Sequence, residues 1–446
     1  MNRREIERLE CELGNYLDSM LAGMGRVERR AAMRGYVTGL LLDGERKSIE
    51  PIAGRLVDDA SEIQGMRQRL QQAVTVAEWS DAEIFRRVAI KVDRELPGIE
   101  AFVIDDTGFP KKGQCSVGVK RQYSGTLGRT DNCQVAVSLH LAGEAGSACI
   151  DMRLFLPEDW AADADRRRAT KVPASIDHQP KWKIAIEQID SALAAGIRRH
   201  IVLADAGYGD CSEFREALDE RRLQYVVGTN GRPVVWAPDS CPRLTDGAGR
   251  DGRRAYHDPK SPPIAIKELA STLTYRKFTW REGSRGWQSG RFAAARIRTA
   301  KDHQNGCLPG EEQWLLCQWF DGDDAPTKFW LSTLPADTSV RTLVRLAKLR
   351  WRVERDYQEL KQEIGLDHFE GRTWRGFHHH VALCAVAHAF LALRRALFPP
   401  EQDKVDAAGS QEAPPADPSL PNRLVSALLP AGGGAFARAR TVQDLM

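Results

Sequence analysis

The sequence predicts a mixed α/β (α+β) fold in which helices flank a mixed sheet, with a helical region before the sheet and a β-rich insertion within it. Residues 1–97 show helical periodicity, whereas several short segments after residue 100 have the apolar patterning of strands. Farther along, apolar runs alternate with helical patterns, which is typical of strands joined by crossover helices. Tryptophan-bearing strand candidates between residues 229 and 334 then interrupt this alternation.

Residues 1–97 are predicted to form a small helical domain. Ser80 and Glu83 fit a capping box at the start of the apolar-periodic run AEIFRRVAIKV. Arg and Lys recur through the whole region. This composition fits both a solvated helical bundle and a domain that contacts DNA.

Residues 98–228 are predicted to form the first part of a core sheet. Four successive segments have strand character and imply an antiparallel meander: AFVID, CSVGV, CQVAVSLHLA and ACIDMRLFLP. A helical stretch, the apolar run HIVLAD, a second helical stretch and the strand QYVVGT follow in that order. This part of the chain therefore predicts strands connected by crossover helices.

The remaining chain divides into three predicted segments. Residues 229–334 hold the tryptophan-bearing strand candidates, separated by Gly-, Pro- and Asp-rich connections, and are predicted to form a β-rich insertion. Residues 335–398 return to helical periodicity, with a long helix that ends near Gly365 and an apolar helix after it. Residues 399–446 are rich in Pro, Ala and Gly and are predicted to form a mobile tail.

Composition narrows the class of protein without naming a function. Hydrophobic residues make up 42% of the 446 residues and charged residues 28%, which fits a globular chain of two or three domains. The 64 basic and 61 acidic residues leave a net charge of +3, which neither requires nor excludes a nucleic-acid partner. Neither an uncharged apolar run of about 18 residues nor a secretory signal is present, so we expect no membrane span and a cytoplasmic location. The nine cysteines include no CxxC pair, which argues against a cysteine zinc site.

Acidic residues follow two of the predicted strands. Asp105 and Asp106 end the strand AFVIDD, and Asp205 follows the apolar run HIVLA. On neighbouring strands of one sheet these carboxylates would lie about 5 Å apart and would repel one another unless a cation lay between them. Mg²⁺ suits such a site because it prefers oxygen ligands and keeps waters for substrate phosphates. Each aspartate alone is also compatible with an ordinary turn.

A third carboxylate would complete a two-metal site for phosphodiester chemistry. The predicted helix RLAKLRWRVERDYQELKQEIG offers Glu354, Glu359 and Glu363. Arg350 lies four residues before Glu354 and Lys361 seven residues after it, so all three lie on one face of a continuous helix. That face could meet both metal and phosphate, although ordinary ion pairs on a solvated helix would give the same pattern.

Three long strings resemble the DDE transposases of bacterial insertion sequences, and more narrowly the branch whose ribonuclease H-like core is interrupted by a β insertion before the catalytic glutamate. They are VIDDTGFPKKGQCSVGVKRQYSGTLGRTDNCQVAVSLHLA, LADAGYGD and LRWRVERDYQELKQEIGLDHFEGRTWRGFHHH. The wider group has the signature Tyr-x2-Arg-x3-Glu-x6-Lys, whose last three positions match Arg350, Glu354 and Lys361. The tyrosine position holds Ala347 instead, although Tyr357 lies on the same predicted helix.

The resemblance implies a ribonuclease H-like fold and a catalytic triad. Asp105, Asp205 and Glu354 would be the catalytic residues and would bind two Mg²⁺ or Mn²⁺ ions, with Asp106 as the rival of Asp105. The implied function is metal-dependent cleavage of transposon-end DNA and strand transfer into target DNA. The implied partners are double-stranded DNA, as inverted-repeat ends and as target, and a second copy of the chain in a synaptic homodimer. The implied location is the bacterial cytoplasm, at the nucleoid when DNA is bound.

Two other functions stay open at this point. A transposase-derived DNA-binding protein would keep the fold and the basic surfaces without cutting DNA. A structure-selective nuclease of ribonuclease H-like fold would keep the chemistry without joining DNA ends.

Basic and aromatic residues near the triad are the candidates for DNA binding. Lys111, Lys112, Lys120, Arg121 and Arg129 follow the first aspartate, and Arg350, Lys361, Arg372 and Arg375 lie on or after the glutamate helix. A charged surface hairpin would explain the first group as well. Six tryptophans crowd the insertion, and Trp287, in the polar loop GSRGWQSG, is the least core-like and the candidate for stacking on a DNA base. His378, His379 and His380 open an apolar helix and point in different directions, which argues against joint metal binding.

Overall fold

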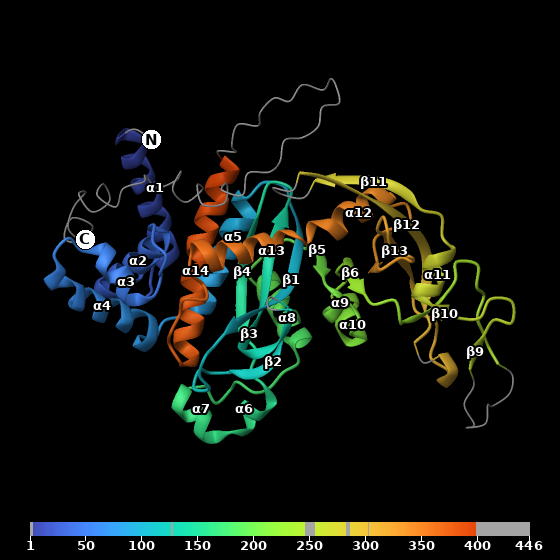
Figure 1. Cartoon of the computed structure of the whole chain (residues 1–446), viewed down its shortest axis with the longest axis horizontal. Helices are drawn as coiled ribbons and strands as arrows, with labels where there is room; N and C mark the ends of the chain where they lie inside the picture. The colour runs from blue at the N-terminus through green and yellow to red at the C-terminus, as the bar shows by residue number, and fades with distance from the viewer. Residues whose placement is uncertain (1–2, 126–127, 246–254, 282–285, 302, 398–446) are drawn as a thin grey trace.

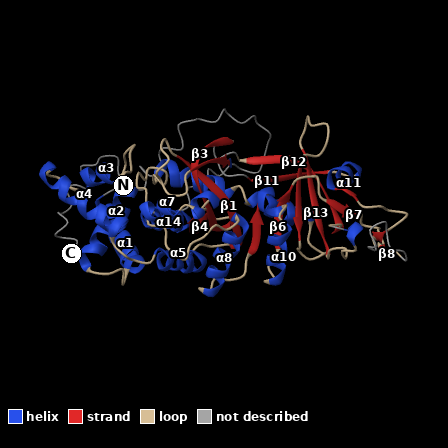
Figure 2. Ribbon diagram, turned by 90° about the horizontal axis from the view of Figure 1, so that it is seen from below, coloured by secondary structure: helices blue, strands red, loops and turns tan. Residues whose placement is uncertain are grey.

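The computed structural model describes residues 3–125, 128–245, 255–281, 286–301 and 303–397. One twelve-stranded sheet runs along the molecule, with helices packed against it and a group of N-terminal helices at one end (Figures 1 and 2). The predicted mixed α/β fold is therefore confirmed. The predicted tail, residues 399–446, lies outside the described residues.

Five strands form the centre of the sheet. They are β1 (Ile99–Pro110), β3 (Arg129–Gly143), β4 (Ser147–Leu154), β5 (Ile201–Ala204) and β6 (Tyr225–Thr229). Their order is β4-β3-β1-β5-β6, in which β3 is antiparallel to β1 and β4, whereas β5 is parallel to β1 and β6. A meander followed by parallel strands in this order is the ribonuclease H-like arrangement that the resemblance implied.

One predicted strand is wrong. The segment CSVGV, residues 115–119, forms a loop and a turn, and strand β2 (Lys120–Ser124) begins only after it. Val117 and Val119 are nevertheless buried. The segments of Arg372 and Trp160 lie against them: the backbone N–H of Val117 donates to the carbonyl of Arg372, and the carbonyl of Val119 accepts from the Trp160 indole. Burial under neighbouring segments, rather than strand pairing, explains the apolar pattern.

The β-rich insertion continues the same sheet. Its strands are β7 (Val234–Trp236), β10 (Ile264–Ala265), β11 (Arg276–Arg281), β12 (Trp287–Thr299), β13 (Glu312–Trp319) and β14 (Lys328–Ser332). Strand β14 pairs antiparallel with β6, so backbone hydrogen bonds join the insertion directly to the core. A separate ribbon pairs β8 (Arg243–Leu244) with β9 (Tyr256–His257), and helix α11 (Ile266–Thr272) follows β10.

The N-terminal helices pack around a helix from much later in the chain. They are α1 (Arg3–Leu21), α2 (Val27–Leu41), α3 (Ile49–Leu56), η1 (Ala60–Glu62), α4 (Ile63–Gln71), the π-helical turn η2 (Gln72–Val76) and α5 (Asp81–Glu95). Helix α14 (Trp374–Leu397) contacts α2, η2, α5 and strand β4 (Figure 1). By length and composition α14 is long and apolar enough to cross a membrane, but 78% of its most apolar window is buried inside the protein, as in a core helix.

Shorter helices connect the core strands and carry the glutamate. Between β4 and β6 these are α6 (Glu158–Ala162), α7 (Ala164–Thr170), α8 (Lys181–Ala194), α9 (Ala206–Gly209) and α10 (Ser212–Glu220). The segment after the insertion consists of α12 (Val340–Leu349), α13 (Arg352–Gln358) and the π-helical turn η6 (Glu359–Glu363). The predicted single helix is therefore wrong in its continuity, because Arg350 and Trp351 form a turn between α12 and α13. Gly365 ends the segment with a φ of +83°, as its predicted role as a stop requires.

Candidate active site

Two aspartates lie where the pairing of β1 with β5 stops. The parallel register pairs Val103 with Leu203, and two further residues along each strand bring Asp105 opposite Asp205. Strand β1 stays paired with β3 as far as Pro110, so Asp105 lies inside β1. The prediction that Asp105 and Asp106 end this strand is therefore wrong. Because β5 ends early, the sheet is open beside Asp105. The backbone of Asp205 then lies one strand spacing, ~4.8 Å, from the backbone of Asp105.

Asp105 is a partly buried carboxylate with an arginine partner. Its side chain is 14% exposed, and its Oδ2 accepts a hydrogen bond from Nη1 of Arg350 at 3.0 Å. The pKa of Asp105 is raised to about 6, mainly by burial. The positive charge of Arg350 lowers this pKa, whereas the negative charges of Asp205 and Asp106 raise it further. The site thus has an excess of negative charge on oxygen donors, which fits a divalent cation such as Mg²⁺.

Asp205 caps the short helix α9. Its Oδ1 accepts hydrogen bonds from the backbone N–H groups of Gly207 at 2.9 Å and of Tyr208 at 3.3 Å. These bonds hold the carboxylate at the end of β5, in the way that an N-cap residue holds a helix start. The residues that follow it, the string AGYG, form α9 itself and place this helix against β6.

Gly209 and Gly228 allow α9 to lie close to β6. A Cβ on Gly209 would lie 1.9 Å from the carbonyl oxygen of Gly228, a backbone atom that cannot turn away. We expect Gly209→Ala to lower the free energy of unfolding by about 1–3 kcal/mol or more, as overpacking does. Thermal unfolding followed by circular dichroism measures this loss. Gly113→Ala is the control, because its Cβ would meet no atom within 4 Å; equal melting temperatures for the two variants would contradict the close packing.

Arg350 links two of the predicted carboxylates, Asp105 and Glu354. Its Nη1 bonds to Asp105, and its Nη2 lies 3.5 Å from Oε1 of Glu354. Burial lowers the pKa of Arg350, but the negative charges of Asp105, Asp205 and Glu354 outweigh burial and raise it. The side chain of Glu354 is 55% exposed and that of Arg350 is 24% exposed, so the glutamate lies on the solvent side of the guanidinium.

The guanidinium of Arg350, and not a ready-made ligand cluster, occupies the centre of the site. Within the described part of the chain, no three His, Cys, Asp or Glu side chains are arranged as ligands of one ion. Asp105 and Asp205 lie just beyond the last paired residues of β1 and β5, whereas Glu354 is linked to Asp105 through Arg350. The structure thus brings Asp105 and Glu354 together at the positively charged guanidinium of Arg350.

Asp106 faces the other side of the sheet from Asp105, since successive residues of a strand alternate. Its Oδ2 accepts a hydrogen bond from Nζ of Lys181, the first residue of α8, at 2.7 Å. The geometry therefore groups Asp105, and not Asp106, with Arg350 and Glu354. No local pattern in the sequence pointed to Lys181, because it lies 75 residues after its partner.

A model of the DDE superfamily endonuclease family matches residues 19–287. The chain belongs to this family. The matched region contains Asp105 and Asp205 and ends before Glu354. The resemblance to DDE transposases of insertion sequences is confirmed by this match together with the relative described next.

A curated relative, a probable transposase for insertion sequence element IS701 from Microchaete diplosiphon, is 30% identical over 202 residues. The alignment covers 44% of this DDE family chain and 48% of the relative, so the chain spans about half the length of that protein. Among solved structures, the cryo-EM structure of a piggyBac transposase synaptic complex with hairpin DNA aligns with 94% of this chain and 86% of its own chain. That alignment has a TM-score of 0.35 and 10% sequence identity.

Two of the predicted DNA-binding lysines of this DDE family chain point into the protein. The Nζ of Lys361 donates to the carbonyl of Gly108 at 2.8 Å and lies 5.4 Å from the centre of the Phe109 ring. Burial lowers the pKa of Lys361 to about 8. The Nζ of Lys111 donates to the carbonyl of Phe369 at 2.9 Å, and burial lowers its pKa as well. Both lysines therefore tie the end of β1 to the segment that follows the glutamate.

Most of the other predicted basic residues lie on the surface. The exposed ones are Lys112, Lys120, Arg121, Arg129 and Arg372. Lys120 pairs with Asp159 at 3.1 Å, which leaves the charge close to solvent, where ion pairs are weak and exchange readily. Arg375 is different, because it bonds to Glu78 at 2.8 Å and to the carbonyl of Val76, and so joins α14 to the N-terminal helices.

The aromatic residues of the insertion separate into core and surface. Trp236, Trp280 and Trp330 are buried in the sheet, whereas Trp287 is 75% exposed at the start of β12. Trp314 and Trp319 are partly buried. Trp287 is thus the least core-like of the six tryptophans, in agreement with its polar sequence context.

The three adjacent histidines have structural roles. His379 bonds to the carbonyls of Val74 and Trp79 and stacks on the Trp79 ring at 3.6 Å. His380 bonds to the hydroxyl of Tyr36 at 2.9 Å. Burial lowers the pKa of both His379 and His380 to about 4, so both rings are neutral at pH 7 and His379 donates to one of its two carbonyl partners at a time. Their separate partners agree with the expectation that they would point in different directions.

Proposed function

We propose that this DDE family chain is a transposase that cleaves transposon-end DNA and joins the cut end to target DNA. The observation that carries the proposal is that Arg350 bonds to Asp105 and lies 3.5 Å from Glu354, while Asp205 directly follows the strand that pairs with the strand of Asp105. Carboxylates from two neighbouring strands and from a following helix are the donor set that phosphodiester chemistry with two metal ions requires.

Asp105 and Asp205 are the proposed metal ligands, with Glu354 as the third and with Mg²⁺ or Mn²⁺ as the ions. Two bound ions would activate the attacking oxygen and stabilise the leaving oxygen of the phosphodiester. Arg350 neutralises Asp105 before the reaction and, in this proposal, exchanges that bond for a phosphate oxygen when DNA arrives. The same exchange frees Glu354 to turn towards the aspartates.

DNA would be held by the cations and the aromatic residue around this site. Lys112, Lys120, Arg121 and Arg372 are exposed and would contact phosphates, which position a duplex without reading its sequence. Trp287 would stack on a base near the cut end, a contact worth about 1–3 kcal/mol. Lys361 would reach a phosphate only after releasing Gly108, so its main contribution in the uncomplexed protein is to hold β1.

The remaining assignments follow from the same proposal. Residues 1–97 would form the helical DNA-binding domain, residues 98–228 and 335–398 the catalytic core, and residues 229–334 the insertion. Two copies of the chain would pair the two transposon ends in a synaptic homodimer. The reaction would take place on DNA in the bacterial cytoplasm.

The test uses the full chain and a duplex that carries the inverted repeats flanking its coding region. We expect strand breaks at the repeat ends and joined products in Mg²⁺ or Mn²⁺, and neither product in EDTA. Binding of the duplex without breaks in Mg²⁺ would instead identify a DNA-binding protein derived from a transposase. Breaks without joined products would identify a structure-selective nuclease.

A further inference from the structure

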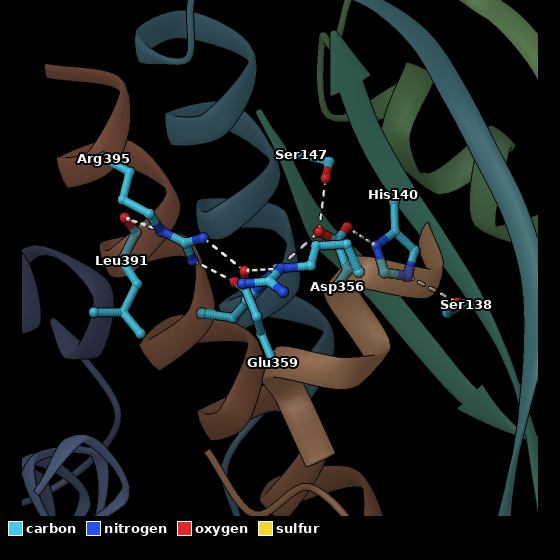
Figure 3. A network of polar contacts seen from close by, with 9 residues as sticks. Ser138, His140, Ser147, Asp356, Glu359, Leu391 and Arg395 are labelled. Atoms are coloured by element: carbon cyan, nitrogen blue, oxygen red, sulfur yellow. Dashed lines mark hydrogen bonds and ion pairs between the residues drawn. The ribbon is translucent and has the colours of Figure 1, made fainter. Parts of the chain in front are cut away.

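Buried polar side chains form a hydrogen-bonded chain between β3 and α13, of which Figure 3 shows Ser138, His140 and Asp356. Oδ2 of Asp356 lies 2.7 Å from Nδ1 of His140, and Nε2 of His140 lies 3.0 Å from the hydroxyl of Ser138. That hydroxyl lies 2.6 Å from the hydroxyl of Tyr357. His140 can donate from Nδ1 to the Asp356 carboxylate and accept from Ser138 at Nε2. Ser138 can in turn accept from Tyr357, so every group in the chain has a partner.

These bonds join α13, the helix of Glu354, to strand β3, which pairs with the strand of Asp105. Ser138 is the register partner of Asp105 across β1 and β3, and its hydroxyl lies 3.4 Å from the Asp105 carbonyl. Asp356 and Tyr357 are the second and third residues after Glu354 in α13. The chain therefore connects the strand of the first aspartate to the helix of the glutamate.

A second buried carboxylate anchors the same segment from the opposite direction. Glu359 accepts hydrogen bonds from Arg355 at 2.9 Å and from Arg395 of α14 at 2.7 Å (Figure 3). Although burial alone raises the pKa of Glu359, its contacts with His388 and Arg395 outweigh burial and lower it, so Glu359 is ionised. His388 also lies 3.7 Å from Asp356, which places both carboxylates around one imidazole.

The order Ser138–His140–Asp356 is that of a nucleophilic triad, but its burial excludes that role. Ser138 and His140 are 0% exposed and Asp356 is 3% exposed, so no substrate reaches the serine hydroxyl. Buried ionic groups of this kind add little stability compared with an apolar replacement, whereas they require one orientation of the groups they join. The chain is therefore suited to orienting its helix.

We propose that Asp356 and Tyr357, through His140 and Ser138, are positioning residues that set the rotation of α13 and so direct Glu354 towards Asp105. Tyr357 lies three residues after Glu354 on the same helix face, so its bond to Ser138, the register partner of Asp105, holds Glu354 on the side of Asp105. The inference rests on the proposed function of Glu354 as a metal ligand. Local sequence patterns do not predict these hydrogen bonds, because Asp356 lies 216 residues from His140.

The test compares Tyr357→Phe and Asp356→Asn with wild type in two assays on the full chain. Mn²⁺ alone is titrated and the free ion is followed by electron paramagnetic resonance, and the kcat and KM of end cleavage are measured separately. We expect the Mn²⁺ dissociation constant to rise about tenfold, as for partners that orient metal ligands, and kcat to fall by a similar factor at an unchanged KM. Gln358→Ala, at the exposed neighbouring position, is the matched control and should behave as wild type.

Unchanged Mn²⁺ affinity and kcat in Tyr357→Phe would overturn the inference, and so would a lowered melting temperature without either change. Tyr357→Phe removes one hydroxyl only, so it remains informative if Asp356→Asn does not fold. Glu354→Gln is measured alongside to separate the two proposals. If Glu354→Gln impairs Mn²⁺ binding and cleavage while Tyr357→Phe and Asp356→Asn do not, only the positioning role is wrong. If Glu354→Gln behaves as wild type, the proposed function itself is wrong.

Discussion

Glu354→Gln is expected to abolish cleavage of transposon-end DNA while leaving DNA binding unchanged. The amide keeps the size of the side chain and removes the negative charge that would bind metal. We expect the single-turnover cleavage rate to fall by about 10³-fold or more, which corresponds to about 4 kcal/mol in the activation barrier. Stability should change little, because the Glu354 side chain is 55% exposed and pairs only at 3.5 Å with Arg350.

The control for this result lies on the same segment. Glu363→Gln changes the same chemical group two turns later and is expected to keep wild-type cleavage. A labelled end duplex reports cleavage on a denaturing gel, and a mobility shift in EDTA reports binding. Wild-type cleavage by Glu354→Gln would refute the assignment and would move the search to Glu359 or Glu363. Of these two, Glu359 is held away by Arg355 and Arg395.

Asp105→Asn is expected to remove cleavage as completely as Glu354→Gln, whereas Asp106→Asn should retain it within about tenfold, the smaller loss typical of residues outside the metal shell. The reason is the alternation of β1: Asp105 faces Arg350, and Asp106 bonds to Lys181 on the other side of the sheet. Both variants are compared in the same single-turnover assay. The reverse ranking would make Asp106 the first ligand.

Asp105→Asn should also make the metal-free protein more stable. The folded protein raises the pKa of Asp105 from 3.8 to about 6, so an ionised Asp105 destabilises the folded state above that range. Removing the charge should increase the free energy of unfolding by about 1–3 kcal/mol near pH 8. The gain should shrink as the pH falls through about 6 and vanish below about 3.8, where the carboxyl is protonated in both states. Urea denaturation in EDTA at about pH 8 and pH 5 measures the difference, and an equal gain at both pH values would contradict it.

Local patterns in the sequence were enough for the fold class and for the approximate positions of the carboxylates. Strand periodicity located β1, β3 and β4, and the apolar run before Asp205 located β5. The segment at residues 115–119 has the apolar pattern of a strand without being one, because burial under neighbouring segments leaves the same pattern. The turn at Arg350 was missed because the residues around it have ordinary helix propensity.

Contacts between distant parts of the chain could not be predicted in the same way. The pairing of Asp106 with Lys181 and that of Asp356 with His140 join segments 75 and 216 residues apart. Spacing along one helix or strand carries no information about such partners. Spacing likewise placed Arg350, Glu354 and Lys361 on one continuous face, whereas the break after α12 and the π-helical turn η6 direct Lys361 inward to Gly108.

The position of α14 has a consequence for synthesis on the ribosome. The helices α2 and α5 bury their apolar faces against α14, which is translated about 300 residues later, so the N-terminal helices cannot complete their packing early. Their exposed faces would be targets for chaperones throughout elongation. A gene copy interrupted before the α14 codons would therefore yield a product whose N-terminal helices are also misfolded, and proteolysis would remove it rather than leave a competing DNA-binding fragment.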